Sequence, residues 1–130
     1  MQPYFRDAVG GDLAAIATIL RAAEPHDVDQ QRATPETYRR LLDEIDRHDG
    51  CYLLVGEYDS QIGAVLQFTV FPSLAGCGRT AEIVGLWSAE SFRVSGLDAM
   101  LLDHAIGRVA DLGCGRLQVM ASGSRRHEHA

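Results

Sequence analysis

The chain has 130 residues, of which 46% are hydrophobic and 23% charged, and this composition indicates one soluble globular domain over residues 1–130. Its formal net charge of −6 disfavours a nucleic-acid-binding protein, because such proteins need basic surfaces to contact phosphates. The sequence contains no apolar run near the roughly 20 residues that a membrane-spanning helix needs and no signal-peptide pattern, so we expect a cytoplasmic protein without a membrane partner.

The first predicted elements are a strand and a helix. Residues 3–8 are expected to form the strand, which two consecutive glycines end. A helix is expected over 13–23, because its apolar side chains recur at helical spacing and fall on one face. Asp12 directly precedes this helix, and its side chain is expected to cap the free N–H groups of the first turn.

A second helix is predicted after a polar segment. Residues 24–33 are polar and include a proline, so we expect a loop there. Thr34 and Pro35 then predict a helix start, with the threonine at the N-cap and the proline at the first helical position. This helix is expected to end near residue 47.

Three strands, one helix and a last strand complete the pattern. The three strands are expected over 51–58, 61–71 and 79–89, and the helix over 97–112. The last strand is expected to begin at Arg116 and to end at Ala121, with a flexible tail over 122–130. The order βααβββαβ predicts an α+β fold with a mixed, mostly antiparallel twisted sheet flanked by helices.

The segment 89–102 carries the clearest functional signal. It follows an apolar strand, turns around Gly96 and opens an amphipathic helix, which places free N–H groups where an anion such as a pyrophosphate can bind. The segment can be compared with the pattern Arg or Gln, two residues, Gly, one residue, then Gly or Ala. Arg93 and Gly96 match this pattern, but the last position is Asp98. This pattern and the element order resemble the acyl-CoA loop and core of the GNAT superfamily of N-acetyltransferases.

The resemblance covers nearly the whole chain and implies an activity and a set of binding residues. It implies acetyl-CoA-dependent transfer of an acetyl group directly to a small primary amine, without a metal. Compared with the usual fold of the family, the chain is expected to lack the C-terminal helix and hairpin. The implied cofactor-binding residues are Leu86, Trp87 and Ser88, through their backbone groups, and the loop residues Arg93, Val94, Ser95, Gly96, Leu97 and Asp98.

Two interpretations of Asp98 remain open from the sequence. Ser95 and Asp98 fit a capping box, in which the carboxylate satisfies the helix N–H groups itself. Alternatively, the loop still binds pyrophosphate. A like charge at ~5 Å and a dielectric constant of ~20 would then cost about 3 kcal/mol, less if solvated. That cost corresponds to a loss of roughly one to two powers of ten in affinity.

Glu82 is the candidate general base. The resemblance places the family's usual glutamate at Val84, and Glu82 lies two residues earlier, on the same face of the strand. The alternative is that Glu82 is an ordinary polar residue near a strand end. The family's C-terminal tyrosine acid has no counterpart, because no tyrosine follows Tyr58. An inactive GNAT-like domain that serves as a binding or assembly subunit is therefore the second hypothesis.

The remaining features concern partners and metals. The last strand carries Leu117, Val119 and Met120 at an exposed edge, which predicts a homodimer or a complex with a related subunit that covers the strand from Arg116 to Ala121. The three cysteines are far apart and lack metal-ligand spacing, so a reducing compartment and no metal site are expected. His127 and His129 are interpreted as tail residues.

Overall fold

The order of strands and helices agrees with the prediction, with short helical segments added. The computed structural model describes residues 2–75 and 77–119. Its elements are β1 (Tyr4–Asp7), η1 (Gly10–Asp12), α1 (Leu13–Ala23), α2 (Val28–Arg32), α3 (Pro35–Arg47), β2 (Cys51–Tyr58), β3 (Gln61–Ser73), β4 (Gly78–Ser88), η2 (Glu90–Ser95), α4 (Leu97–Asp111) and β5 (Arg116–Val119), where η marks a 3-10 helix. The predicted end of the last strand at Met120 and Ala121, and the predicted tail over 122–130, lie outside the described residues.

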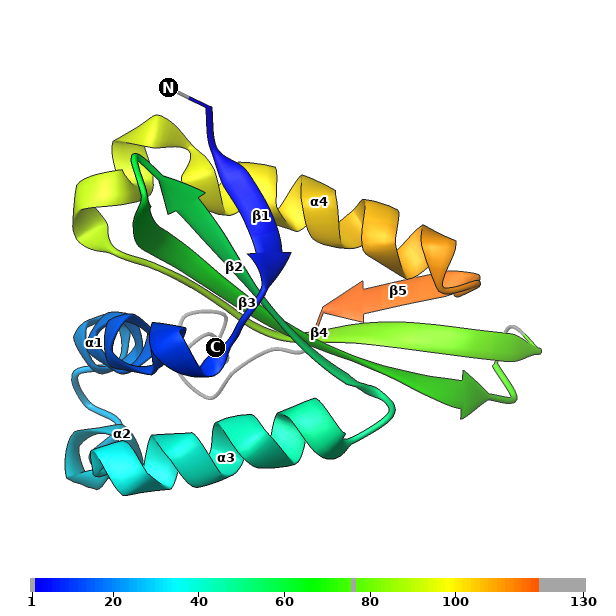
Figure 1. The fold of residues 1–130 in the computed structure, drawn as a ribbon. Coiled ribbons are helices and arrows are strands. Elements are labelled where there is room, and N and C mark those ends of the chain that lie inside the picture. The colour runs from blue at the N-terminus through cyan, green and yellow to red at the C-terminus, as the bar shows by residue number, and fades with distance from the viewer. Residues whose placement is uncertain (1, 76, 120–130) are drawn as a thin grey trace.

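The described strands form one sheet in the order β1-β2-β3-β4-β5. The first three neighbouring pairs are antiparallel and the pair β4–β5 is parallel, with α4 in the connection between them. Parallel neighbours need such a crossover connection. Figure 1 shows α1, α2 and α3 on one side of the sheet and α4 on the other. The predicted α+β class with a mixed, mostly antiparallel sheet flanked by helices is confirmed.

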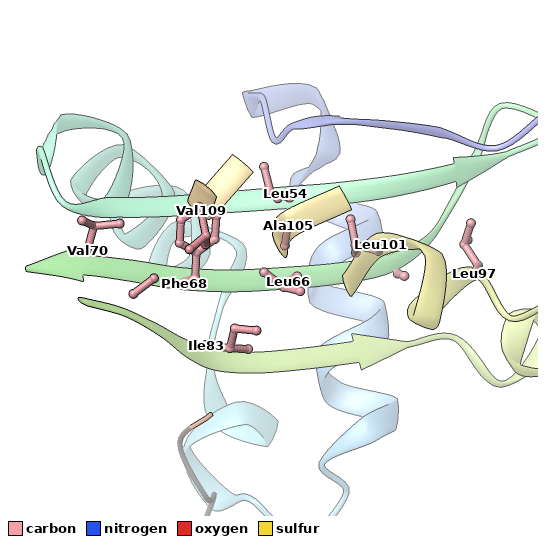
Figure 2. Close-up of a cluster of buried hydrophobic side chains, with 11 residues drawn as sticks. Leu54, Leu66, Phe68, Val70, Ile83, Leu97, Leu101, Ala105 and Val109 are labelled. Atoms are coloured by element: carbon pink, nitrogen blue, oxygen red, sulfur yellow. The ribbon is translucent and has the colours of Figure 1, made fainter. Parts of the chain in front are cut away.

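Alternate strand residues build a hydrophobic core on each face of the sheet. On the other face from α4, Val55 and Val65 are fully buried and pack with Ile16 and Ile19 of α1. Successive side chains of a strand point to opposite faces, so a residue that contacts α1 and the next residue along the strand lie on different faces of the sheet. The cluster beneath α4 contains Leu54, Leu66, Phe68, Val70, Ile83, Leu97, Leu101, Ala105 and Val109 (Figure 2).

The polar segment between α1 and α3 is not entirely loop, as had been expected for residues 24–33. The short helix α2 lies within it, and the Asp27 carboxylate caps this helix by accepting a hydrogen bond from the Gln30 N–H at 3.1 Å. The predicted start of α3 is confirmed, because Thr34 Oγ1 accepts a hydrogen bond from the Thr37 N–H at 3.2 Å. Side-chain caps of this kind satisfy N–H groups that have no acceptor within the helix.

Asp12 does not cap α1 with its side chain, contrary to the sequence prediction. Its carboxylate accepts two hydrogen bonds from the Arg6 guanidinium, at 2.7 and 2.9 Å, and one from the Val9 N–H at 2.8 Å. Arg6 Nε also donates to Glu57 at 2.6 Å. The Asp12 side chain is only 7% exposed, so this network buries a charge that Arg6 compensates. The Arg6 guanidinium, chiefly through its hydrogen bonds, holds the pKa of the Asp12 carboxyl below its usual value.

No helix within the described part of the chain is both long enough and apolar enough to cross a lipid bilayer.

Candidate active site

The strand β4 carries a β-bulge in its middle. On β3, Phe68 pairs with Ile83 of β4. The neighbouring pair joins Gln67 to Gly85, so Val84 is an extra residue in β4. A bulge bends a strand and redirects its side chains, and bulges are frequent beside active sites. Val84 is also the position where the resemblance places the usual glutamate, so the bulge lies at the expected position of the general base.

The parallel pairing of β4 with β5 is described up to the same level. Ile83 and Val119 form the last described pair. Beyond it, β4 continues to Ser88 with β3 on one side and, among the described residues, no strand on the other. In Figure 1, β5 accompanies one half of β4, and the other half runs on toward η2. Leu86, Trp87 and Ser88, the residues expected to bind through their backbone, lie in β4 beyond this last described pair.

Glu82 lies just before the bulge, on the face of α1 and α3. Its strand neighbours Ala81 and Ile83 belong to the cluster under α4, so alternation places Glu82 on the opposite face. The carboxylate is partly exposed, and Glu82 Oε1 accepts a hydrogen bond from Gln118 Nε2 of β5 at 3.1 Å. The candidate base is therefore oriented by a side chain that the sequence analysis did not single out.

The indole ring of Trp87 lies over Gly85, on the same face as Glu82. A Cβ atom at Gly85 would be only 2.2 Å from Trp87 Cη2, so a side chain at position 85 would require the indole ring to move. Trp87 also packs against the cluster of Val65 and Ile16 beside α1. The bulge explains why Trp87 and Glu82 lie on one face. They are an odd number of residues apart in the sequence, which in a regular strand would place them on opposite faces, and the extra residue in β4 reverses this. The observed position of the indole ring thus depends on Gly85, a residue that sequence reasoning missed.

The loop η2 and the start of α4 are arranged around Gly96. This residue has φ of +73° and ψ of 20°, a left-handed conformation that glycine adopts without strain, and it is the N-cap of α4. The Met100 N–H makes the first helical bond, to the Gly96 carbonyl at 3.1 Å. The N–H groups of Leu97, Asp98 and Ala99 precede it and have no acceptor within the helix. They form the candidate anion site that the sequence predicted.

The capping box proposed for Ser95 and Asp98 is wrong. Ser95 belongs to η2, and its hydroxyl donates to the Phe92 carbonyl at 2.6 Å instead of capping α4. The glycine turn moves the helix start beyond Ser95, which is the physical reason for the error. The Asp98 carboxylate does accept one first-turn hydrogen bond, from the Ala99 N–H at 2.9 Å. Two first-turn N–H groups, those of Leu97 and Asp98, thus remain beside a fixed negative charge.

The other expected loop residues are exposed or structural. Arg93 is exposed in η2, and its carbonyl accepts a hydrogen bond from the Gly96 N–H at 3.3 Å. Val94 lies in η2, but its side chain is outside the described part. The Leu97 side chain is fully buried in the cluster beneath α4, so that only its backbone is available to a ligand.

The η2 loop is anchored on the start of β3. The Ala89 N–H donates to the Gly63 carbonyl at 2.8 Å. A Cβ atom at Gly63 would lie 2.5 Å from Phe92 Cγ and 2.8 Å from Leu97 Cδ2. The Phe92 ring and the Leu97 side chain therefore rest on the glycine backbone, and the position of the loop depends on Gly63 having no side chain.

Replacing Gly63 with alanine is expected to lower the free energy of unfolding by about 1–3 kcal/mol, because overpacking displaces the ring and the loop. Gly107→Ala is the matched control: Gly107 lies in α4, and a Cβ atom there would meet nothing within 4 Å. This control is expected to raise the free energy of unfolding by about 0.5–1 kcal/mol through helix propensity. Urea denaturation measures both, and effects of the same sign would contradict the close contact.

Two surface hollows lie away from Glu82. One, of about 490 Å³, lies between α3 and the start of β2, and its lining includes Asp43 and Asp46. The other, of about 620 Å³, lies between α1 and η2 and includes Ser91 and Phe92. Glu82 lines neither of these two hollows.

Within residues 2–75 and 77–119, no cluster of three or more His, Cys, Asp or Glu side chains is arranged to hold a metal ion. Cys51, Cys77 and Cys114 are free thiols there.

The mixed sheet flanked by helices and the glycine turn at the start of α4 define the fold class, and comparison with known proteins identifies the family. The sequence model of the acetyltransferase (GNAT) family matches residues 13–128. The chain therefore belongs to the GNAT acetyltransferase family. Comparison with curated protein sequences gave no significant match.

Solved structures agree with this assignment. A transcriptional regulator from Bacillus halodurans C-125 is 25% identical, with a TM-score of 0.81 over 96% of this chain and 85% of that one. A putative acetyltransferase from Agrobacterium tumefaciens str. C58 is 18% identical, with a TM-score of 0.82 over 97% and 86%. An aminoglycoside N-acetyltransferase in complex with CoA is 14% identical, with a TM-score of 0.76 over 98% and 82%. The last two similarities concern the fold alone.

Proposed function

We propose that the chain is an acetyl-CoA-dependent N-acetyltransferase that transfers the acetyl group directly to a small primary amine. The observation that carries the proposal is the left-handed glycine turn at Gly96, which begins α4 after β4 and η2 and leaves first-turn N–H groups without an acceptor in the helix. The backbone of the last residues of β4 and the first turn of α4 offer polar groups to the two polar parts of CoA. These parts are the amide-containing pantetheine arm and the pyrophosphate.

In this proposal the chain holds acetyl-CoA mainly through its backbone. Leu86, Trp87 and Ser88 bind the pantetheine arm, and the N–H groups at the start of α4 bind the pyrophosphate. Arg93 is exposed in the same loop and adds a positive charge near that group. Because the glycine turn and the Gly63 contact fix the loop, the backbone donors are positioned before the ligand arrives, which reduces the entropic cost of binding.

The chemical step follows from the position of Glu82. Its carboxylate accepts a proton from the ammonium form of the acceptor, and the amine nitrogen then forms a bond to the thioester carbonyl carbon. The carbon–sulfur bond breaks, the second proton of the nitrogen passes through water to the CoA thiolate, and Glu82 releases its proton to the solvent. Positioning of the two reactants supplies much of the rate enhancement in such a direct transfer. Relatives titled as aminoglycoside and glucosamine-6-phosphate N-acetyltransferases support nitrogen of a small molecule as the acceptor.

The Asp98 carboxylate is expected to weaken, but not to abolish, the binding of acetyl-CoA. Its charge lies at the helix start, where it repels an incoming pyrophosphate across a partly solvated gap. We expect Asp98→Asn to tighten the dissociation constant for CoA by about tenfold to a hundredfold, which corresponds to about 1–3 kcal/mol. Isothermal titration calorimetry with acetyl-CoA and CoA measures the effect and tests the proposed function.

The matched control is Asp103→Asn, an equal charge change at an exposed position further along the same helix. It is expected to change the affinity little, because an exposed charge beyond the first turn is screened. No heat of binding with the parent or with Asp98→Asn would refute the proposal, and equal gains from both substitutions would remove the specific role of Asp98.

The second candidate function is that of a binding or assembly subunit. The observation that favours it is the apolar edge of β5, where Leu117 is 37% and Val119 66% exposed. Exposed apolar strand edges promote pairing with another chain. Under this alternative a second copy or a related subunit covers β5. Light scattering would then show a dimer in a sample that gives no heat with acetyl-CoA.

A further inference from the structure

The hydrogen bond between Gln118 and Glu82 joins two strands at the edge of the proposed site. The parallel register places Gln118 of β5 directly beside Glu82 of β4, and the two side chains meet at 3.1 Å on the face of α1 and α3. The following pair, Ile83 and Val119, is the last described pair of these strands. Gln118 and Glu82 therefore lie side by side on this face of the sheet.

A partly exposed glutamate needs a partner to keep one orientation. Its side chain has several rotatable bonds, and in water it samples many rotamers, which costs free energy each time a productive one must form. The Gln118 amide fixes one carboxylate oxygen and leaves the other, Oε2, able to accept a proton from an acceptor amine. The contact thus reduces the conformations of Glu82 without using up its acceptor capacity.

The partner of Glu82 is a neutral amide and not a cation. The ion pairs among the described residues involve Asp7, Asp12, Glu36 and Glu57. A guanidinium beside a carboxylate strongly favours its charged form and makes it a weaker base. A neutral amide donor orients the carboxylate with a smaller effect on its basicity, which suits a group that must take up a proton and release it again.

We propose that Gln118 is a positioning residue for the carboxylate of Glu82, and this inference rests on the proposed function, in which Glu82 is the base. Gln118 acts through Glu82 and does not contact the reacting atoms. It therefore affects the chemical step and leaves the binding of acetyl-CoA unchanged.

The first test detects the contact without using activity. In a ¹H–¹⁵N spectrum, the side-chain NH₂ signals of Gln118 are expected to titrate with pH in the parent protein and to lose this titration in Glu82→Gln. Assignment uses the disappearance of the signals in Gln118→Met, which keeps the side-chain length and removes the donor. Signals of Gln118 that do not respond to the ionisation of Glu82 would overturn the proposal, whatever the activity.

The second test uses thiol release from acetyl-CoA with a panel of diamines, amino sugars and aminoglycosides. Gln118→Met is expected to lower kcat/KM for the amine about tenfold, as for loss of a hydrogen bond to a charged group, with an unchanged KM for acetyl-CoA. Gln61→Met, the same change at an exposed residue of the β2–β3 hairpin, is expected to leave these quantities unchanged.

A double-mutant cycle separates positioning from a general structural role. If Gln118 acts through Glu82, then Gln118→Met has no further effect in the Glu82→Gln background. An equal loss in both backgrounds would overturn the proposal. A parent protein that releases no thiol with any amine, while the Gln118 signals still titrate, would refute the proposed function and leave the contact without a catalytic role.

Discussion

Replacing Arg6 with methionine is expected to lower the free energy of unfolding by about 3 kcal/mol at pH 7, because the substitution leaves a buried carboxylate without its cation. The Asp12 side chain, 7% exposed, would lose two hydrogen bonds and keep only the one from the Val9 N–H. Methionine retains the length and most of the apolar stem of the arginine. Urea denaturation of both proteins measures the difference.

The difference in the free energy of unfolding between the parent and Arg6→Met is expected to decrease as the pH falls. The pKa of Asp12 is lowered in the folded protein, chiefly by the hydrogen bonds from Arg6. A lowered pKa contributes stability that is present above the unfolded carboxyl pKa and is lost as the pH falls through the folded one. The parent should lose this contribution on acidification below about pH 4. The destabilisation caused by Arg6→Met should therefore shrink between pH 7 and pH 3.

The control for this experiment is Arg39→Met. Arg39 forms an ion pair with Glu36 on the surface of α3, where both side chains are 61% exposed. Exposed pairs contribute little because solvent screens them, so we expect an unchanged unfolding midpoint. A pH-independent effect of Arg6→Met would show that lost packing, and not the unpaired Asp12 carboxylate, causes the destabilisation.

Replacing Glu82 with glutamine is expected to lower kcat/KM for the amine about a hundredfold near neutral pH, the usual contribution of a general base. The loss should decrease at high pH, where the free amine predominates and needs no base. Binding of acetyl-CoA should not change, because Glu82 lies before the bulge and the residues proposed to bind the cofactor, Leu86 to Ser88, would do so through their backbone. Steady-state rates across pH, together with calorimetry, measure both parts.

Glu44→Gln is the matched control, since Glu44 is exposed on α3 and lies outside the site. It is expected to leave the rates unchanged. A loss of less than threefold in Glu82→Gln would favour the other interpretation, in which Glu82 is an ordinary polar residue of the strand. Gln118 would then be a structural partner only.

The elements that carry local signals were predicted well. The spacing of apolar residues predicted α1, and the Thr34–Pro35 pair predicted the start of α3. The short helix α2 was missed because five residues are too few to show helical periodicity, and only Asp27 signals it. Local chemistry misled the prediction at Ser95, where the spacing of a capping box is present but the turn at Gly96 moves the helix start.

The features that define the site depend on pairing between distant strands. The bulge at Val84 appears only in the register of β4 against β3, and the contact between Gln118 and Glu82 only in the register against β5. Register follows from the packing of whole faces and from turn geometry, so a single sequence does not specify it. Glu82 could be singled out from its strand position, whereas the residues around it could not.

The chain contains a single tryptophan, and it lies over Gly85 at the bulge. Its intrinsic tryptophan fluorescence therefore originates at one place, between the candidate base and the strand edge proposed for acetyl-CoA. The fluorescence of Trp87 therefore reports on the proposed site. Unfolding would expose this indole to water, whereas a ligand along β4 would change its surroundings in the folded state. One unmodified signal can thus follow both stability and occupancy.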